Sequence, residues 1–213
     1  MAPNEKAFSD ITGTPTNYAR TTRQDYGTRG RRATFHCTSR FYNVMTAAFR
    51  ELWEVCPLGR AQVIVCAGAY VNKPGQHGRG QAFDLDALFW AHRSLVALNY
   101  PSDSRFYLGV ESILRRHCGT VLDYHYNAAH RDHMHIDAGT TVGFTTGSPS
   151  RVKYVQATLG AIYGRAVVID GLYGPQTDGA INAVLAQQGL AGPLTNVTHW
   201  RAFLLRTARL GLA

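Results

Sequence analysis

Apolar residues recur at helical spacing in two segments of the chain. In residues 43–55 they fall three or four positions apart and Pro57 follows, which predicts an amphipathic helix that ends before the proline. Residues 104–117 show the same spacing, and Gly119 is expected to cap the C-terminal end of that helix. Residues 63–66 form a short apolar run and predict a buried strand.

Two other segments alternate strictly between apolar and polar positions. Residues 82–86 and 133–137 each place apolar side chains on one face of a strand and polar side chains on the other. The apolar positions are Phe83, Leu85, Met134 and Ile136. The opposite faces carry Ala82, Asp84, Asp86, His133, His135 and Asp137. Such strands suit a polar cleft backed by a hydrophobic core.

These elements predict an α+β domain over residues 35–140, with helices around a small antiparallel sheet. Residues 1–34, rich in Thr, Arg, Gly and Asn, are expected to form an irregular arm, and residues 87–97 a further short helix. Residues 141–150 are polar and predict a linker. Residues 151–213 are expected to form a small three-helix C-terminal domain, in which Thr177 would be the N-cap of the second helix.

The histidines and aspartates of the alternating segments indicate a metal site. Zinc binds neutral imidazole nitrogen and carboxylate oxygen, and a catalytic zinc keeps three protein ligands and one open position. His77 precedes the first alternating segment, Asp84 lies within it, and His135 lies in the second. The three would form the ligand set for one zinc ion (Zn2+) per chain.

The residues around His77, Asp84 and His135 form a motif that is more specific than the positions of these three residues alone. His-x-x-Gly-x-Ala-x-Asp over 77–84, followed by His-x-His over 133–135, resembles the zinc peptidases of peptidoglycan. That group includes D-Ala-D-Ala carboxypeptidases, murein endopeptidases and lysostaphin-like enzymes, and the hedgehog signalling domain shares its fold. Over residues 35–140 the chain most resembles the bacterial extensin-like C-terminal domain family, through residues 119–122 and 126–137. The resemblance implies a zinc cleft and hydrolysis of an amide in the stem peptide or cross-link.

Amide hydrolysis also needs a general base and a group that stabilises the oxyanion or protonates the leaving amine. By resemblance, Asp132 stands at the place of the carboxypeptidase base. His130 and His133 stand where the penicillin-insensitive murein endopeptidase has catalytic imidazoles. Strand alternation would turn Asp132 away from the other site residues, which favours His133 in the site while Asp132 is kept as the expected base. The sequence leaves open which of Asp132, His133 and His130 acts as the base. Asp137 or Asp86 is expected to orient an imidazole that binds the metal.

The chain departs from the family pattern at two positions before the first histidine. The family usually has Ser where this chain has Gly75, and it often has an upstream Arg that holds the substrate, where this chain offers Lys73. Lys73 is therefore the candidate substrate-binding residue. A lysine supplies a point charge without the bidentate geometry of an arginine, so the grip on substrate would differ.

Residues 151–205 resemble the peptidoglycan-binding domain found beside many wall hydrolases. The resemblance lies in the Asp-Gly-x-x-Gly-Pro-x-Thr core over 170–177. The usual Phe-Gln of that family is replaced by Leu-Ala-Gln at 185–187, so glycan contacts are expected to differ.

Charge and composition limit the partners. Lys and Arg number 22 against 14 acidic residues, and the net charge of +8 draws the chain to polyanions. Nucleic acid, teichoic acid and anionic peptidoglycan all qualify by charge. No aromatic and basic nucleic-acid module is visible, so peptidoglycan is the expected partner and nucleic acid is not. No apolar run reaches the roughly 20 residues of a membrane span.

The N-terminal sequence lacks the pattern of a secretory signal, which leads us to expect synthesis in the cytoplasm and action in the periplasm or wall of a bacterium. Delivery would then depend on a phage holin, an injection apparatus or lysis, and an immunity protein is a conceivable partner. The four cysteines Cys37, Cys56, Cys66 and Cys118 form no Cys-x-x-Cys pair, and either disulfides or buried thiols are compatible with their spacing.

The sequence therefore predicts a zinc-dependent peptidoglycan peptidase of the endolysin or antibacterial toxin type. The alternative is a non-catalytic cell-wall-binding protein that zinc stabilises. A zinc nuclease is a third possibility by charge and histidine content, but it lacks supporting motifs.

Overall fold

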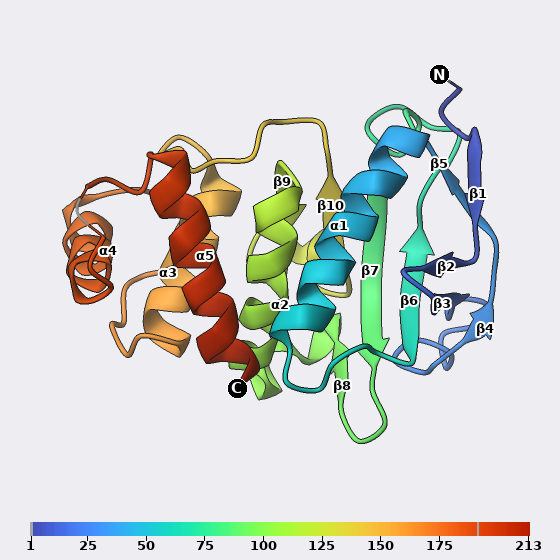
Figure 1. Ribbon diagram of the computed structural model, residues 1–213, viewed down its shortest axis with the longest axis horizontal. Coiled ribbons are helices and arrows are strands. Elements are labelled where there is room, and N and C mark those ends of the chain that lie inside the picture. Colours follow the sequence, from blue (N-terminus) through green and yellow to red (C-terminus); the bar gives the residue numbers. More distant parts are fainter. Residues whose placement is uncertain (1, 191) are drawn as a thin grey trace.

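A mostly antiparallel sheet of eight strands lies at the centre of the molecule in the computed structural model, which describes residues 2–190 and 192–213 (Figure 1). Its strands are β2 (Asp10–Ile11), β3 (Thr14–Tyr18), β4 (Arg31–Arg32), β6 (Val63–Gly68), β7 (Ala82–Phe89), β8 (Ser94–Val96), β9 (Thr120–Leu122) and β10 (Met134–Asp137). The order is β2-β3-β6-β7-β10-β9, with β4 on β3 and β8 on β7, and only β3 and β6 run parallel. β1 (Lys6–Phe8) and β5 (Phe35–Cys37) pair separately.

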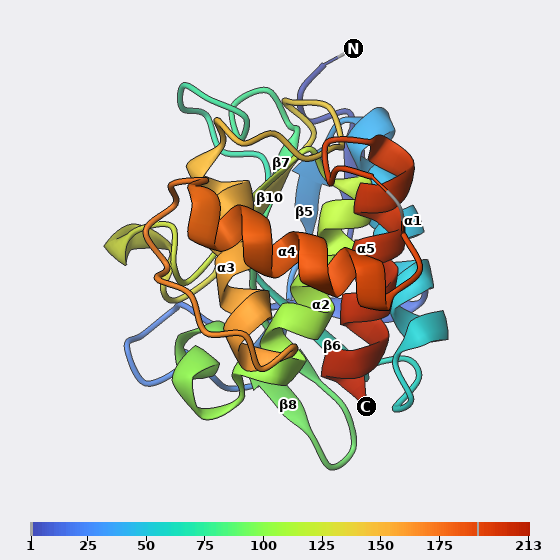
Figure 2. The ribbon, with the colours of Figure 1, turned by 90° about the vertical axis from the view of Figure 1, so that its left-hand side faces the viewer.

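Five α-helices accompany the sheet, and the predicted α+β class is confirmed (Figures 1 and 2). They are α1 (Ser39–Val55), α2 (Ser104–His117), α3 (Pro149–Ala161), α4 (Pro175–Gln187) and α5 (Val197–Leu212), with short 3-10 helices η1 (Ala97–Ser102) and η2 (Ala128–His130). Within the described part of the chain, none of these helices has the length and apolar character needed to cross a membrane. The four cysteines are buried free thiols.

The first predicted helix begins earlier than its apolar spacing indicates. The Thr38 side chain accepts a hydrogen bond from the backbone N–H of Phe41 at 3.2 Å and thereby caps α1. Phe41 in the first turn is buried with Met45 and Ala48, so the apolar face of the helix begins before residue 43. At the other end the helix stops at Val55, before Pro57, as predicted.

The predicted alternation of β7 and β10 is confirmed. The ring of Phe83 in β7 lies edge-on to Phe49 of α1 at 6.3 Å between centroids, and Leu85 is buried in the same core. Met134 and Ile136 of β10 are fully buried in the same core. Because side chains alternate along a strand, Asp84 lies on the face of the sheet opposite α1. The antiparallel register places His135 directly opposite Asp84.

The prediction that residues 1–34 form an irregular arm is wrong, because that segment contains β1 to β4. β3 pairs in parallel with β6, with Thr16 beside Ile64 and Asn17 beside Val65. These N-terminal strands are two to five residues long, and β3 buries polar side chains such as Thr16. No apolar alternation marks them in the sequence, because β6 supplies the hydrogen-bond partners that make β3 a strand.

The short helix expected over residues 87–97 is also wrong. β7 continues to Phe89, and β8 turns back to pair with it, with Leu88 opposite Leu95. Periodicity alone cannot separate a short helix from two short strands over so few residues. The observed arrangement is a β-hairpin.

Gly119 does not cap α2 in the left-handed conformation. The helix ends at the extended residue Cys118, and a Cβ atom on Gly119 would lie 1.8 Å from the backbone oxygen of Thr140. Glycine is therefore required because two chain segments approach closely there.

The three predicted C-terminal helices are present, and their packing is continuous with the rest of the core. α5 crosses α2 where Gly109 meets Gly211, and a Cβ on Gly211 would lie 2.5 Å from the backbone oxygen of Arg105. Phe144, in the predicted linker, is buried against Trp200 of α5. The N-cap of α4 is Gly174 and not Thr177, because Pro175 starts the helix and Thr177 is buried in its first turn, where it accepts a hydrogen bond from Gln156.

A buried ion cluster of Glu111, Arg115 and Asp123 joins α2 to β9 and α3. Arg115 Nε donates to Glu111 Oε1 at 2.7 Å, and Arg115 Nη2 donates to the backbone oxygens of Val121 and Ser150. Glu111 Oε2 and Asp123 Oδ2 have no donor among the described residues. Burial and the nearby Asp123 carboxylate raise the pKa of Glu111 well above its usual value. A proton on Glu111, shared with Asp123, would satisfy both orphan oxygens.

Replacing Glu111 with Gln is expected to make the protein more stable at alkaline pH relative to the parent. The folded-state pKa of Glu111 is raised, so its contribution to stability is complete below the unfolded pKa near 4.5 and is lost as pH rises through the folded value. The difference in unfolding free energy should grow by up to about 1.4 kcal/mol per pH unit within that window. Urea unfolding at pH 5, 7 and 9 measures it, with exposed Glu54→Gln as the control. Parallel stability curves for parent and variant would contradict the shared proton.

Candidate metal centre

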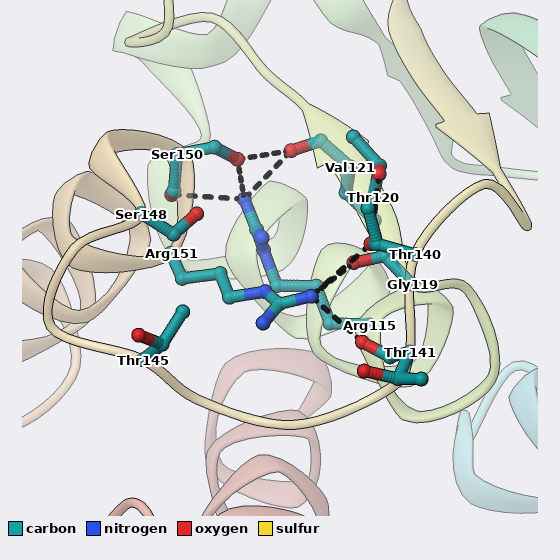
Figure 3. A pocket seen from close by; sticks show the side chains of 10 residues that line it. All are labelled: Arg115, Gly119, Thr120, Val121, Thr140, Thr141, Thr145, Ser148, Ser150 and Arg151. Carbon is teal, nitrogen blue, oxygen red and sulfur yellow. Dashed lines mark hydrogen bonds between the residues drawn. The ribbon is translucent and has the colours of Figure 1, made fainter.

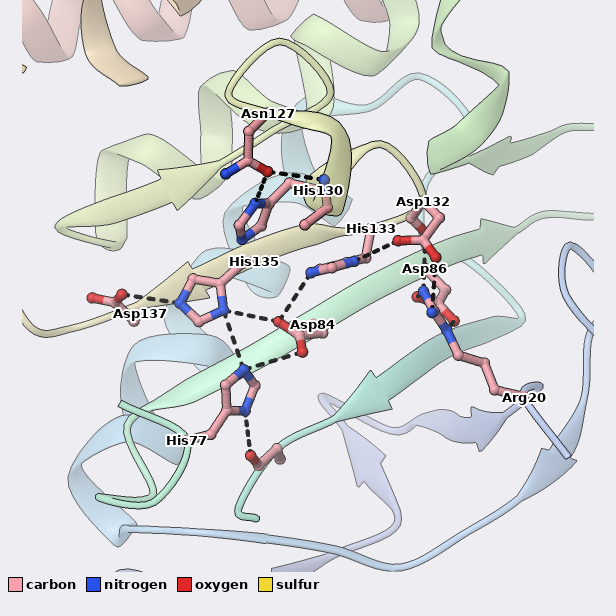
Figure 4. Close-up of polar contacts among 12 residues, drawn as sticks. Arg20, His77, Asp84, Asp86, Asn127, His130, Asp132, His133, His135 and Asp137 are labelled. Carbon is pink, nitrogen blue, oxygen red and sulfur yellow. Dashed lines mark hydrogen bonds and ion pairs between the residues drawn. The ribbon is translucent and has the colours of Figure 1, made fainter. Parts of the chain in front are cut away.

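Three side chains from separate segments converge on the sheet face opposite α1 (Figure 4). His77 Nε2 lies 3.1 Å from Asp84 Oδ2 and 3.2 Å from His135 Nδ1. His135 Nδ1 lies 2.9 Å from Asp84 Oδ1. The structure thus brings together the three ligands expected from the sequence. We call them the His77–Asp84–His135 cluster.

The loop before β7 positions His77. His77 Nδ1 donates to the backbone oxygen of Ala69 at 2.5 Å, which directs Nε2 toward the cluster. Gly80 of the same loop has φ +63°, and a Cβ there would lie 1.7 Å from the backbone oxygen of Pro3. The glycine of the motif is therefore fixed by a left-handed backbone and by the N-terminal segment packed against it.

The second imidazole is oriented from behind by a carboxylate. His135 Nε2 contacts Asp137 Oδ2 at 3.1 Å, and the backbone N–H of Gly139 donates to Asp137 Oδ1 at 2.7 Å. This contact leaves His135 Nδ1 for the cluster, which is the arrangement that fixes metal-binding imidazoles in proteins. Of the two aspartates considered from the sequence for this role, Asp137 contacts an imidazole, whereas Asp86 pairs with Arg20.

The carboxylates of the cluster favour positive charge on its imidazoles. Burial acts to raise the pKa of Asp84, but hydrogen bonds from His135 and His77 outweigh it and hold that pKa well below its usual value. Burial acts to lower the pKa of His135, but Asp137 and Asp84 raise it to about 9. The Asp84 carboxylate is therefore ionised, and a bound cation would take the place of the His135 proton.

The donor set fits zinc. Ligand atoms of a tetrahedral zinc site, each about 2.0–2.1 Å from the metal, lie roughly 3.3 Å from one another. The two imidazole nitrogens lie 3.2 Å apart, and each lies close to a different oxygen of Asp84, His77 Nε2 at 3.1 Å from Oδ2 and His135 Nδ1 at 2.9 Å from Oδ1. Once His135 has lost its proton, two imidazoles and one carboxylate are also the kinds of ligand that a catalytic zinc takes.

His133 lies beside the cluster and contacts Asp132. His133 Nδ1 lies 2.7 Å from Asp132 Oδ1, and His133 Nε2 lies 3.7 Å from Asp84 Oδ1. The expectation that Asp132 points away from His133 is wrong, because β10 begins at Met134 and the alternation does not extend to residue 132. The Asp132 carboxylate therefore lies behind His133 rather than at the cluster.

Arg20 was not expected from the sequence, yet it holds Asp132 in place. Arg20 Nη1 donates to Asp132 Oδ2 at 2.9 Å, and Arg20 Nε and Nη2 donate to the two oxygens of buried Asp86 at 2.7 and 2.6 Å. Tyr26 also donates its hydroxyl to the backbone oxygen of Asp132 at 2.7 Å. No local pattern marks Arg20 or Tyr26, because both lie in the segment expected to be irregular.

His130 lies at the edge of the same group. Its Nδ1 donates to Asn127 Oδ1 at 2.7 Å, and its ring centroid lies 5.1 Å from that of His133. Burial and the neighbouring imidazoles lower the pKa of His130 to about 4, so this ring is neutral at pH 7.

Lys73 is not brought into this arrangement. Its side chain is exposed on the loop that leads to His77. It makes no hydrogen bond or ion pair with any residue that the structure describes. Its predicted role in substrate binding stays a prediction.

One known protein family matches the segment of the chain that carries these residues. The family described as extensin-like protein C-terminus matches residues 54–146. Searches among curated proteins and among solved structures found no match. The matched segment contains His77, Asp84 and His135 together with Asp132 and His133. The candidate metal centre thus lies within an extensin-like C-terminal segment, residues 54–146 of this chain.

Proposed function

We propose that the protein is a zinc-dependent peptidoglycan peptidase that hydrolyses an amide bond of the stem peptide or cross-link. The observation that carries the proposal is the His77–Asp84–His135 cluster with His133 beside it. The substrate class rests on the resemblance of residues 35–140 to the zinc peptidases of peptidoglycan. When bound, zinc would lower the pKa of water and polarise the scissile carbonyl.

The hydrogen bonds around Asp132 favour His133 as the general base. Both carboxylate oxygens of Asp132 are engaged, Oδ1 with His133 and Oδ2 with Arg20, so Asp132 has no oxygen directed at the cluster. The contact with Asp132 places the proton of neutral His133 on Nδ1 and leaves the lone pair of Nε2 on the side of Asp84. His133 would accept a proton at Nε2, and Asp132 would orient it and stabilise the charged imidazole.

His130 has a different task in this proposal. Asn127 Oδ1 accepts hydrogen bonds from the backbone N–H of Ala129 and from His130 Nδ1, so the neutral His130 ring has a free acceptor at Nε2. An acceptor there would bind an N–H group of the peptide substrate. Lys73, exposed on the neighbouring loop, would contact a substrate carboxylate.

The three C-terminal helices would hold the enzyme on the wall. This part of the proposal rests on the resemblance of residues 151–205 to the peptidoglycan-binding domain. Binding to the polymer would raise the local concentration of scissile bonds. Action in the periplasm or wall, delivery through a holin or an injection apparatus, and inhibition by an immunity protein belong to the same proposal.

The direct test is digestion of purified peptidoglycan by zinc-loaded protein, with mass spectrometry of the released fragments. New amine ends that disappear after chelation and return with added zinc are expected, and their masses identify the bond. Stoichiometric zinc and firm wall binding without any new amine ends would reject the peptidase. That result would favour the alternative, a wall-binding protein that zinc stabilises.

Replacing Arg20 with Ala is expected to lower kcat by about tenfold to a hundredfold without loss of zinc, the usual cost of removing a group that orients a site residue. The cause would be loss of the ion pair that holds Asp132 behind His133. Arg23→Ala, a nearby exposed arginine, is the matched control. Unchanged kcat in Arg20→Ala, at equal zinc content and equal thermal stability, would refute the positioning role. A higher KM with an unchanged kcat would instead assign Arg20 to substrate binding.

A further inference from the structure

A polar pocket lies beside β9, at the edge of the sheet (Figure 3). It is formed where β9, the start of α3 and the chain between β10 and α3 meet, and it encloses about 220 Å³. It is lined by Arg115, Gly119, Thr120, Val121, Thr140, Thr141, Thr145, Ser148, Ser150 and Arg151. None of these residues belongs to the His77–Asp84–His135 cluster.

The pocket carries positive charge without an acidic counterpart. No aspartate or glutamate lines it. The charge of Arg115 is compensated from behind by Asp123 at 3.7 Å, while Glu111 accepts a hydrogen bond from Arg115 at 2.7 Å. Arg151 has no acidic partner within salt-bridge distance among the described residues. Its Nη2 is held by the backbone oxygens of Gly119 and Thr141, both at 2.7 Å.

The positive charges of Arg115 and Arg151 repel each other in this arrangement. Burial and then repulsion from Arg115 lower the pKa of Arg151. A partly buried guanidinium beside a second one is costly unless an anion neutralises the pair. The charge distribution around Arg151 is therefore that of an anion site.

Several donors in the pocket remain free for a ligand. Nη1 of Arg115 and both Nε and Nη1 of Arg151 make no hydrogen bond within the described residues. The same holds for the hydroxyl groups of Thr145 and Ser148. Ser148 is the N-cap residue of the 13-residue helix α3, yet its side chain makes no capping bond, and the positive end of the helix dipole adds to the field.

We propose that this pocket binds a phosphate group. Its donors come from three separate segments, α2, α3 and the chain after β10, and donors from several directions suit four tetrahedral oxygens better than the two coplanar oxygens of a carboxylate. The volume is smaller than the roughly 300–1,000 Å³ of sites that enclose a whole drug-sized ligand. The ligand is therefore inorganic phosphate or the phosphate of a larger molecule that extends into solvent.

Isothermal titration of the full-length protein at constant ionic strength tests the proposal, with inorganic phosphate, dimethyl phosphate and acetate as probes. We expect one phosphate per chain. Arg151→Gln should weaken binding by roughly tenfold to a hundredfold, since one charge-assisted contact is lost. Dimethyl phosphate is a diester, whereas inorganic phosphate is not. Tighter binding of dimethyl phosphate would indicate a phosphodiester of a polymer as the ligand, and tighter binding of inorganic phosphate would indicate free phosphate.

A second variant guards against misfolding, because Arg151 also ties two backbone segments together. Thr145→Val combined with Ser148→Ala removes two free hydroxyls without breaking a side-chain hydrogen bond of the protein. It should weaken phosphate binding several-fold while Arg50→Gln, a change of an exposed arginine on α1, leaves it unchanged. Absence of binding to either phosphate probe would overturn the proposal. So would equal affinity in the parent and both pocket variants, or acetate binding as tight as phosphate binding.

Discussion

Replacing His135 with Ala is expected to reduce bound zinc from one per chain to none and to abolish peptidoglycan hydrolysis. His135 Nδ1 would supply one of the three ligand atoms that the described residues bring together, and it contacts Asp84 directly. With two ligands left, a zinc site loses both affinity and the geometry that catalysis needs. The loss of activity should reach the background rate. Elemental analysis of the purified protein and release of new amine ends measure the two effects.

The matched control is His92→Ala, because His92 is exposed and distant in sequence from the cluster. It should keep full zinc and full activity. Circular dichroism should show that His135→Ala retains the fold, since the hydrophobic core lies on the other face of β10. Undiminished zinc in a folded His135→Ala protein would place the metal elsewhere and remove the basis of the proposed function.

Replacing His133 with Ala should lower kcat by about 10²–10⁴ while zinc stays bound, the range typical for loss of a general base. His133 Nε2 lies on the cluster side of the ring at 3.7 Å from Asp84 Oδ1, but it is not one of the three closest donors. Zinc content, kcat and KM of the variant give the measurement. Added imidazole should restore part of the lost activity, because it can take the place of the missing ring.

This variant also decides between the two candidate bases. If Asp132 were the base, His133→Ala would retain most of its activity and Asp132→Ala would not. His36→Ala, an exposed histidine on β5, controls for a general effect of losing an imidazole. A His133→Ala protein with near-parental kcat would therefore return Asp132 to the role that the family resemblance first implied.

The amino-acid sequence by itself determined the elements whose signals are local. The period of two in residues 82–86 and 133–137 fixed which side chains share a face, because successive side chains of a strand point to opposite sides. Asp84 and His135 therefore lie on polar faces, and the register of the paired strands sets them opposite each other. The two long helices near residues 43–55 and 104–117 followed from their apolar spacing in the same way.

Only the tertiary structure decided what depends on contacts distant in sequence. β3 is a strand because β6 lies beside it, and Arg20 reaches Asp132 across 112 residues of chain. The pocket between Arg115 and Arg151 likewise exists because β9 and α3 meet there. The residues that flank a position in the sequence do not indicate which distant residues will contact it. Periodicity reports which face a side chain occupies, whereas charge pairing and cavities arise only when separate segments pack against one another.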